Sequence, residues 1–274
     1  HLEMRSVLKP RKKVWLSGRK SRRKKRVTVR VQNSYRKEMK QRKRKPPDIE
    51  RGLMTMIRNI VFDMDGVLID TESVFMKCWK KLGEELHLPD VEEVAKQCIG
   101  ITVPKTEALF QKTYGKTFPC KSYVEAANAI FYRQEAEYGI PEKPGVHELF
   151  AYLKKQNYRI GLASSTRKEA VYRQMKAVGI FDAFDVMVCG DMVTRSKPEP
   201  DIYLKACELL KVDPKECYAV EDSYNGIRSA HAAGMKAIMI PDLLQPTPEI
   251  LELTEQKLDS LLDLKDFLES QKEK

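Results

Sequence analysis

Apolar residues gather in five short runs in the later part of the chain, and most of these runs end in polar residues. The first covers residues 57–62 and stops abruptly at Asp63-Met64-Asp65-Gly66. Short, nearly continuous apolar runs are typical of strands that are buried on both faces of a parallel sheet. We therefore predict strands at residues 57–62, 158–163, 186–189, 218–220 and 237–240.

Apolar residues at helical spacing fill the intervals between the later strands. We expect helices at about 146–155, 167–178, 200–210 and 225–233. Gly179 and Gly234 stand where a glycine commonly follows the end of a helix. Because strand and helix alternate, the pattern predicts an α/β fold with a Rossmann-like parallel sheet. Residues 258–268 are expected to close the domain as a short strand or a helix.

The interval between the first two strands is too long for a single crossover. Its apolar residues recur at helical spacing, for example at Val74, Cys78, Leu82 and Leu86. We therefore predict an α-helical cap domain at residues 71–143, inserted into a core that consists of residues 54–70 and 144–274. Asp70 or Thr71 is a candidate for the capping residue of the first inserted helix.

Charge is distributed unequally along the chain. Residues 1–53 hold 21 Lys and Arg against 4 Asp and Glu, whereas residues 54–274 hold 29 against 35. The basic N-terminal tail therefore carries a charge of about +17 and the remainder about −6. A segment this basic and this poor in apolar residues is expected to be disordered in isolation.

The tail has two interpretations. Dense Lys and Arg side chains neutralise phosphates, so residues 1–53 could form a nucleic-acid-binding arm. We favour a non-native extension instead, because the chain begins at His1 and because Met54 and Met56 stand just before the first predicted strand. Nucleic acid is thus expected as a partner only if the tail is native.

The six cysteines form no C-x-x-C pair and no plausible metal-binding spacing with the four histidines. Reduced thiols in a cytoplasmic protein are the simplest account of such scattered cysteines. No signal-peptide core and no apolar run of about 18 residues is present, so we expect no membrane association. A monomer is the simplest expectation for the oligomeric state.

Polar residues gather where the predicted strands end. They are Asp63 and Asp65, the run from Ser164 to Thr166, Lys197, and Glu221 with Asp222. Ligands bind outside the carboxyl ends of the strands in a parallel sheet, so we expect these side chains to converge on one site.

Each of these residues also has an ordinary structural role open to it. The two aspartates could be turn residues, and the lysine could be solvated. Ser165 or Thr166 could cap the helix that follows, and the Glu221-Asp222 pair could cap the helix that begins near Asn225. Four polar strand ends in order along one sheet favour a site over four unrelated turns.

Together, Asp63-Met64-Asp65-Gly66-Val67-Leu68, the Ser164 strand end, Lys197-Pro198 and Glu221-Asp222 resemble the haloacid dehalogenase superfamily of phosphohydrolases. The resemblance covers residues 57–268. The chain also resembles one branch of this superfamily in the position of its helical cap and in its acidic pair. This branch contains sugar-phosphate phosphatases and β-phosphoglucomutases. This resemblance implies a phosphatase for a small phosphorylated metabolite, such as a sugar phosphate or a nucleotide-like compound.

The resemblance also implies the roles of individual residues. Asp63 would be the nucleophile that forms an aspartyl phosphate, and Asp65 would be the general acid and base. Mg²⁺ is the implied cofactor, held by the Asp63 carboxylate, the Asp65 backbone carbonyl and the Asp222 carboxylate, with Glu221 as a further candidate ligand.

The remaining motif residues would bind the phosphate group. Ser164 and Ser165 would donate hydrogen bonds to phosphate oxygens, and Lys197 would offset the negative charge of phosphate and nucleophile. Gly66 would let the backbone pass close to the ligand.

A β-phosphoglucomutase is the alternative within the same family. Such mutases carry an arginine in the cap loop and a histidine in the first cap helix. Here the loop reads Gly100-Ile101-Thr102-Val103-Pro104, and the helical position is Phe75. Both departures favour a phosphatase, because a mutase must hold a second phosphate and exclude water.

Overall fold

The computed structural model describes residues 57–98 and 103–271. The predicted disorder of residues 1–53, and the nucleic-acid binding considered for them, concern residues outside this part of the chain. No helix in the described part is long and apolar enough to cross a membrane.

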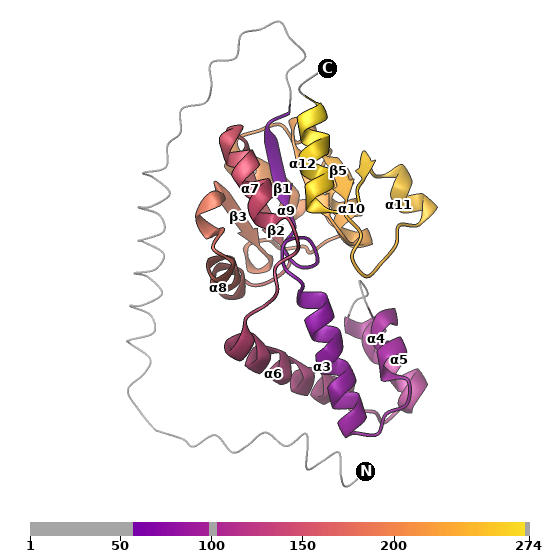
Figure 1. The fold of residues 1–274 in the computed structure, drawn as a ribbon. Coiled ribbons are helices and arrows are strands. Elements are labelled where there is room, and N and C mark those ends of the chain that lie inside the picture. The colour runs from indigo at the N-terminus through magenta and orange to yellow at the C-terminus, as the bar shows by residue number, and fades with distance from the viewer. Residues whose placement is uncertain (1–56, 99–102, 272–274) are drawn as a thin grey trace, which may run out of the picture. The chain divides into compact units, whose positions relative to one another are not determined.

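Six parallel strands form one sheet in the order β3-β2-β1-β4-β5-β6 (Figure 1). Their bounds are β1 Asn59–Phe62, β2 Arg159–Ser164, β3 Val186–Cys189, β4 Tyr218–Glu221, β5 Lys236–Met239 and β6 Gln256–Lys257. The first five confirm the predicted strands, although β1 begins two residues later than expected. The parallel α/β sheet predicted from the apolar runs is thus confirmed.

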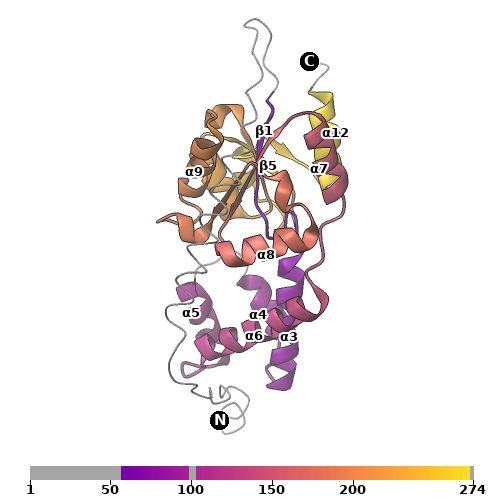
Figure 2. The same ribbon diagram turned by 90° about the vertical axis from the view of Figure 1, so that its left-hand side faces the viewer.

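The alternation of side chains along the strands separates two buried layers. Ile60 and Phe62 of β1 and Ile160 and Leu162 of β2 belong to one apolar cluster, which includes residues of α7 Val146–Lys155 and α12 Leu261–Ser270. The intervening residues face the opposite layer, where α9 Asp201–Leu210 and α10 Tyr224–Ala232 pack on the sheet. Figure 2 shows α9 on the opposite side of the sheet from α7 and α12. Both faces of the sheet are therefore covered, as expected for parallel strands.

The remaining helices complete the connections of the core. They are α8 Lys168–Val178 and α11 Pro248–Glu252, with 3-10 turns at Phe181–Ala183, Gly190–Met192 and Pro214–Glu216. Gly179 is the C-cap of α8, as predicted, and has a left-handed backbone conformation. The predicted closing segment is a helix, α12, and the two-residue strand β6 precedes it.

Among the described residues, four helices precede α7 in the long interval between β1 and β2. They are α3 Thr71–Glu85, α4 Val91–Gln97, α5 Val103–Tyr114 and α6 Cys120–Tyr138. Asp70 caps α3, because its carboxylate accepts a hydrogen bond from the Ser73 backbone N–H at 3.3 Å. The two segments that join these helices to the sheet are bonded to each other, from the Asp70 N–H to the Pro141 carbonyl at 2.8 Å and from the Lys143 N–H to the Leu68 carbonyl at 2.9 Å.

The strand order reverses beside β1. The chain runs from β1 to β2 and β3 on one side, then returns to place β4 on the other side of β1. A crevice forms outside the carboxyl ends of parallel strands at such a reversal. The residues that follow β1 and β4 therefore lie where this fold places a ligand site.

Candidate active site

Asp63 lies directly at the end of β1. Its backbone N–H donates to the Val220 carbonyl at 2.9 Å, which extends the pairing of β1 with β4 by one residue. The Asp63 side chain is buried, with 7% of the residue exposed. A buried carboxylate requires partners of opposite charge or hydrogen-bond donors, and these come from distant parts of the chain.

Lys197 is the principal partner of Asp63. Its ammonium donates hydrogen bonds to Asp63 Oδ1 at 2.7 Å, to Glu221 Oε1 at 2.5 Å and to the Ala163 carbonyl at 3.0 Å. One lysine therefore joins the ends of β1, β2 and β4. Because the Lys197 side chain is only 8% exposed, it is not the solvated lysine considered as an alternative.

Glu221 is held by three side chains. Besides Lys197, the Tyr203 hydroxyl donates to Glu221 Oε1 at 2.6 Å and the Ser223 hydroxyl donates to Oε2 at 3.2 Å. Ser223 is also the N-cap of α10, so the Glu221-Asp222 pair does not cap that helix. Both carboxylate oxygens of Glu221 thus accept hydrogen bonds from neighbouring side chains.

Asp222 lies beside Gly66. The Gly66 backbone has a φ of 78°, and a Cβ atom there would lie 2.2 Å from Asp222 Oδ2. Only glycine allows both this conformation and this close approach. In the described part of the chain, Asp222 is 5% exposed and its carboxylate has no hydrogen-bond or ion-pair partner, which leaves it free for a cation.

The acidic groups outnumber the positive charge in this site. Burial and the neighbouring carboxylates of Glu221 and Asp65 raise the pKa of Asp63 to about 8, against the opposing charge of Lys197. Burial also raises the pKa of Asp222 well above its ordinary range. For Lys197, burial lowers the pKa, but Asp63 and Glu221 outweigh burial and hold it above the usual value. One lysine does not neutralise three buried carboxylates.

These residues fit a divalent cation. Carboxylate oxygens of Asp63, Glu221 and Asp222 lie within 4.8 Å of one another. Oxygen ligands around a carboxylate cluster are the donor set that Mg²⁺ takes in proteins. Because Glu221 already accepts three hydrogen bonds, Asp63 and Asp222 are the better candidates for direct ligands.

Asp65 is held by three hydroxyl groups. Thr71 donates to Oδ1 at 2.7 Å, while Thr166 and Ser164 donate to Oδ2 at 2.8 and 3.3 Å. Sequence reasoning treated Thr71 and Thr166 chiefly as potential helix caps. Asp70, the other candidate, caps α3, and the cap position of α8 is Arg167.

Ser165 is the predicted site residue that the structure does not bring to the others. It is exposed, and no hydrogen bond joins its side chain to the site residues in the described part of the chain. Its neighbour Ser164 is fully buried and lies between Asp65 and the Thr166 backbone N–H, to which its hydroxyl is bonded at 3.0 Å. The geometry thus separates two serines that the sequence could not distinguish.

A cavity of about 230 Å³ opens from Asp65 towards the inserted helices. Residues of the sheet domain and of the inserted helices line it together: Asp65, Thr71, Glu72, Phe75, Phe131, Tyr132, Thr166, Ala170 and Gln174. Phe75, at the position where a mutase would carry histidine, is thus part of the lining. In the loop Gly100 to Pro104, where a mutase would carry arginine, residues 100–102 and the Val103 side chain lie outside the described residues.

Comparisons with known proteins agree with this geometry. The model of the haloacid dehalogenase-like hydrolase family matches residues 60–240. A phosphorylated carbohydrates phosphatase of Thermotoga maritima is 32% identical over 184 residues, which cover 65% of this chain and 82% of the relative. The β-phosphoglucomutase of Bacillus subtilis is 30% identical over 190 residues, which cover 66% of this chain and 82% of that protein.

A solved structure shows the same architecture. The crystal structure of CbbY from Rhodobacter sphaeroides in complex with phosphate has a TM-score of 0.60 and 30% identity, and covers 76% of this chain and 96% of that one. The resemblance inferred from the four motifs is thereby confirmed, including the branch that holds phosphatases and β-phosphoglucomutases.

Proposed function

Because the chain belongs to the haloacid dehalogenase-like hydrolases, we propose that it is a magnesium-dependent phosphatase that hydrolyses a small phosphorylated metabolite through an aspartyl phosphate. The observation that carries the proposal is the contact of Lys197 with both Asp63 and Glu221, beside Asp222, whose carboxylate has no partner among the described residues. This arrangement combines a nucleophile, a cation site and a positive charge at one sheet edge.

In the first step, an Asp63 carboxylate oxygen attacks phosphorus and the bond to the leaving oxygen breaks. Asp65 donates its proton to that oxygen, so the leaving group departs as a neutral alcohol. Hydroxyls of Thr71, Thr166 and Ser164 fix the Asp65 carboxyl group for this transfer.

In the second step, the Asp65 carboxylate takes a proton from water, and the water oxygen attacks phosphorus. The bond from Asp63 to phosphorus breaks, which releases phosphate and regenerates the Asp63 carboxylate. Lys197 stays beside Asp63 throughout and stabilises negative charge on the phosphoryl oxygens.

Asp63, Asp222 and the Asp65 carbonyl would hold Mg²⁺, with Glu221 positioned to support them. The ion would supply further positive charge opposite the phosphate when bound. The raised pKa values of Asp63 and Asp222 support this assignment, because a cation removes the repulsion that causes part of the shift.

Residues 71–143 would act as a cap domain over the core formed by residues 54–70 and 144–274. Support comes from α3 and α6, whose residues Glu72, Phe75 and Tyr132 line the cavity that opens from Asp65. Substrate choice would then depend on the inserted helices. The named activity of the Thermotoga maritima relative supports a phosphorylated carbohydrate as the kind of substrate.

A cytoplasmic location is part of the proposal, supported by six cysteines that are all free thiols. A β-phosphoglucomutase activity is the second candidate, since one relative carries that name. Conversion of β-glucose 1-phosphate into glucose 6-phosphate, without net phosphate release, would favour the mutase.

The proposal is tested with p-nitrophenyl phosphate. We expect hydrolysis to require Mg²⁺, to stop with excess EDTA and to resume when Mg²⁺ is restored. Asp63→Asn should abolish turnover, whereas Asp266→Asn, at a side chain that is 73% exposed on α12, should leave it unchanged. Undiminished turnover of Asp63→Asn, or of the metal-free protein, would contradict the mechanism.

A further inference from the structure

Gln174 of α8 is a buried polar residue that the proposed mechanism does not use. The residue is 5% exposed, and its buried Oε1 atom has no hydrogen-bond partner among the residues that the structure describes. A buried carbonyl without a partner costs about 1–3 kcal/mol, and native proteins contain few of them. Packing of the core therefore does not explain why a polar Gln174 side chain is buried here.

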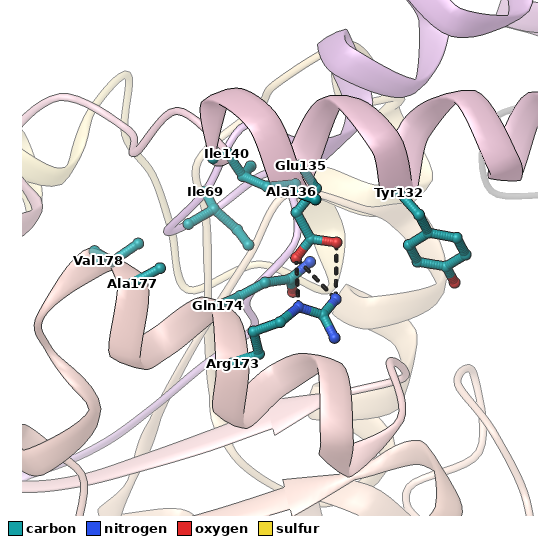
Figure 3. Close-up of a pocket in the computed structure, with 10 residues that line it drawn as sticks. Ile69, Tyr132, Glu135, Ala136, Ile140, Arg173, Gln174, Ala177 and Val178 are labelled. Carbon is teal, nitrogen blue, oxygen red and sulfur yellow. Dashed lines mark hydrogen bonds and ion pairs between the residues drawn. The ribbon is translucent and has the colours of Figure 1, made fainter.

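The position of Gln174 beside two cavities explains its burial. It lines the cavity that opens from Asp65, and it also lines a second cavity of about 380 Å³ that continues between α6 and α8. Figure 3 shows Gln174 and Arg173 extending from α8 towards Glu135 of α6. The unpartnered carbonyl thus belongs to the cleft that a substrate would enter beyond the reacting phosphate.

Charge in the cleft limits what it can bind. Among the described residues that line the cavity next to Asp65 there is no lysine, arginine or histidine, whereas Glu72 contributes a carboxyl group, whose pKa is raised to about 7 by burial and by the neighbouring Asp242. Arg173, in the adjoining cavity, is already matched by a bidentate pair with Glu135 at 2.7 to 3.0 Å. A second anionic group on the substrate would therefore meet Glu72 without a free cation among these residues to offset it.

The other walls are aromatic. Phe75 of α3 and Phe131 and Tyr132 of α6 line the same cavity, and the rings of Phe75 and Phe131 lie 5.6 Å apart. Aromatic surfaces favour the apolar face of a ligand, while Gln174 and Glu72 accept hydrogen bonds from its hydroxyl groups. This is the combination that suits an uncharged ring or chain that carries hydroxyls.

We infer that Gln174 is a specificity-determining residue, which accepts a hydrogen bond from a hydroxyl of the leaving group and selects uncharged, hydroxyl-bearing phosphate monoesters. The inference rests on the proposed phosphatase function and adds to it the chemistry of the leaving group. Sugar or polyol monophosphates are the expected substrates, and bisphosphates or phosphorylated carboxylic acids are poor ones.

The experiment compares Gln174→Met with the wild type on two substrates. The first is the sugar or polyol monophosphate that the wild type hydrolyses best, and the second is phenyl phosphate, whose leaving group carries no hydrogen-bonding substituent. Loss of one neutral hydrogen bond corresponds to about a 3- to 10-fold change. We expect kcat/KM for the hydroxylated substrate to fall by that factor, mainly through KM, with phenyl phosphate unchanged.

The matched control is Gln111→Met, the same substitution on α5 at a residue outside both cavities. Its activity on both substrates should equal that of the wild type. Thermal unfolding of Gln174→Met should occur at the wild-type temperature or above it, because the substitution removes an unpartnered buried carbonyl.

Three results would overturn the inference and leave the proposed phosphatase function in place. Gln174→Met with unchanged kinetics on the hydroxylated substrate would show that the carbonyl makes no contact with the substrate. An equal loss on both substrates would show a structural role. A wild-type preference for a bisphosphate or a phosphorylated carboxylic acid would contradict the charge selection. If the wild type hydrolyses no phosphate ester, including p-nitrophenyl phosphate, the proposed function and the inference fail together.

Discussion

The Lys197 ammonium donates a hydrogen bond to the Asp63 carboxylate at 2.7 Å, although the two residues are 134 positions apart in the chain. The contact forms because β1, β2 and β4 end side by side and leave a space that a long side chain can fill from the segment after β3. The same ammonium contacts Glu221, so removal of one side chain would leave two buried carboxylates facing each other.

Lys197→Met keeps most of the side-chain volume and removes the charge. We expect kcat/KM to fall by about 100-fold or more, because a positive charge next to the transferring phosphoryl group is lost. Loss of one partner of a buried ion pair should also lower the free energy of unfolding by about 3–5 kcal/mol. Steady-state kinetics and urea unfolding measure the two effects.

Lys205→Met is the control for that substitution. Lys205 lies on α9 and pairs at the surface with Glu208, so its replacement should change stability by about 0.5 kcal/mol or less. If Lys197→Met turned over substrate within twofold of the wild type, the placement of Lys197 in the catalytic machinery would be wrong.

Metal binding should depend on pH. Burial raises the pKa of Asp63 to about 8, and a carboxyl with a raised pKa stabilises the fold while it is protonated. This contribution is complete below about pH 4, near the ordinary pKa, and is lost as the pH rises towards 8. Mg²⁺ binds the ionised carboxylates and so competes with protons. We therefore expect a fixed Mg²⁺ concentration to raise Tm more at pH 8 than at pH 5.

Differential scanning calorimetry with EDTA or Mg²⁺ at the two pH values measures this difference. Asp222→Asn should reduce the Mg²⁺-dependent increase in Tm at pH 8, because it removes a carboxylate of the cluster. An increase of equal size at pH 5 and pH 8 would argue against a cation bound by these carboxylates.

Gly66→Ala should have two separate effects, a loss of stability from backbone strain and a loss of activity from displacement of Asp222. The substitution places a methyl group 2.2 Å from Asp222 Oδ2 at a residue with a φ of 78°. We expect a loss of stability of about 1–2 kcal/mol from the left-handed backbone. Displacement of Asp222 should in addition lower kcat/KM by about 100-fold.

Gly179→Ala provides the matched comparison. Gly179 has a φ of 81°, and within the described ranges no atom of a non-adjacent residue lies within 4 Å of an added Cβ atom. It should lose a similar amount of stability and keep its activity. Equal kinetic losses in the two variants would show that Gly66 acts through stability alone.

Thr71→Val and Thr166→Val each remove one hydroxyl from Asp65 with little change in shape. A hydrogen bond to a charged group contributes about 1.5–3 kcal/mol, so kcat should fall about tenfold or more while KM changes little. Thr113→Val on α5, whose hydroxyl donates to the Leu109 carbonyl, is the control and should behave as wild type. A rise in KM with kcat unchanged would assign the two threonines to substrate binding instead.

Much of the fold could be read from the sequence because buried parallel strands leave a strong local signal. The apolar run before Asp63 and the polar residues after it predicted both a strand and its functional end. Strand β6 was not predicted, because its two residues, Gln256 and Lys257, carry no apolar pattern. Its place in the sheet comes from backbone pairing with β5 alone.

The candidate site was predictable where residues follow strands and obscure where they lie on helices. Asp63, Ser164 and Glu221 come together because the sheet aligns their strand ends. Tyr203 gave no signal, since an aromatic residue in the middle of α9 has the pattern of an ordinary core residue. Gln174 could not be identified either, because its contact with the cleft depends on where α6 lies relative to α8.

The identity of the nucleophile is tested most directly by trapping the phosphorylated enzyme. Protein is mixed with ³²P-labelled p-nitrophenyl phosphate and Mg²⁺, quenched in acid and assayed for protein-bound label that hydroxylamine removes, as expected for an acyl phosphate. Because p-nitrophenolate leaves without a proton donor, Asp65→Asn should accumulate the label, while Asp63→Asn should carry none. Hydroxylamine-sensitive label that persists in Asp63→Asn would contradict Asp63 as the nucleophile.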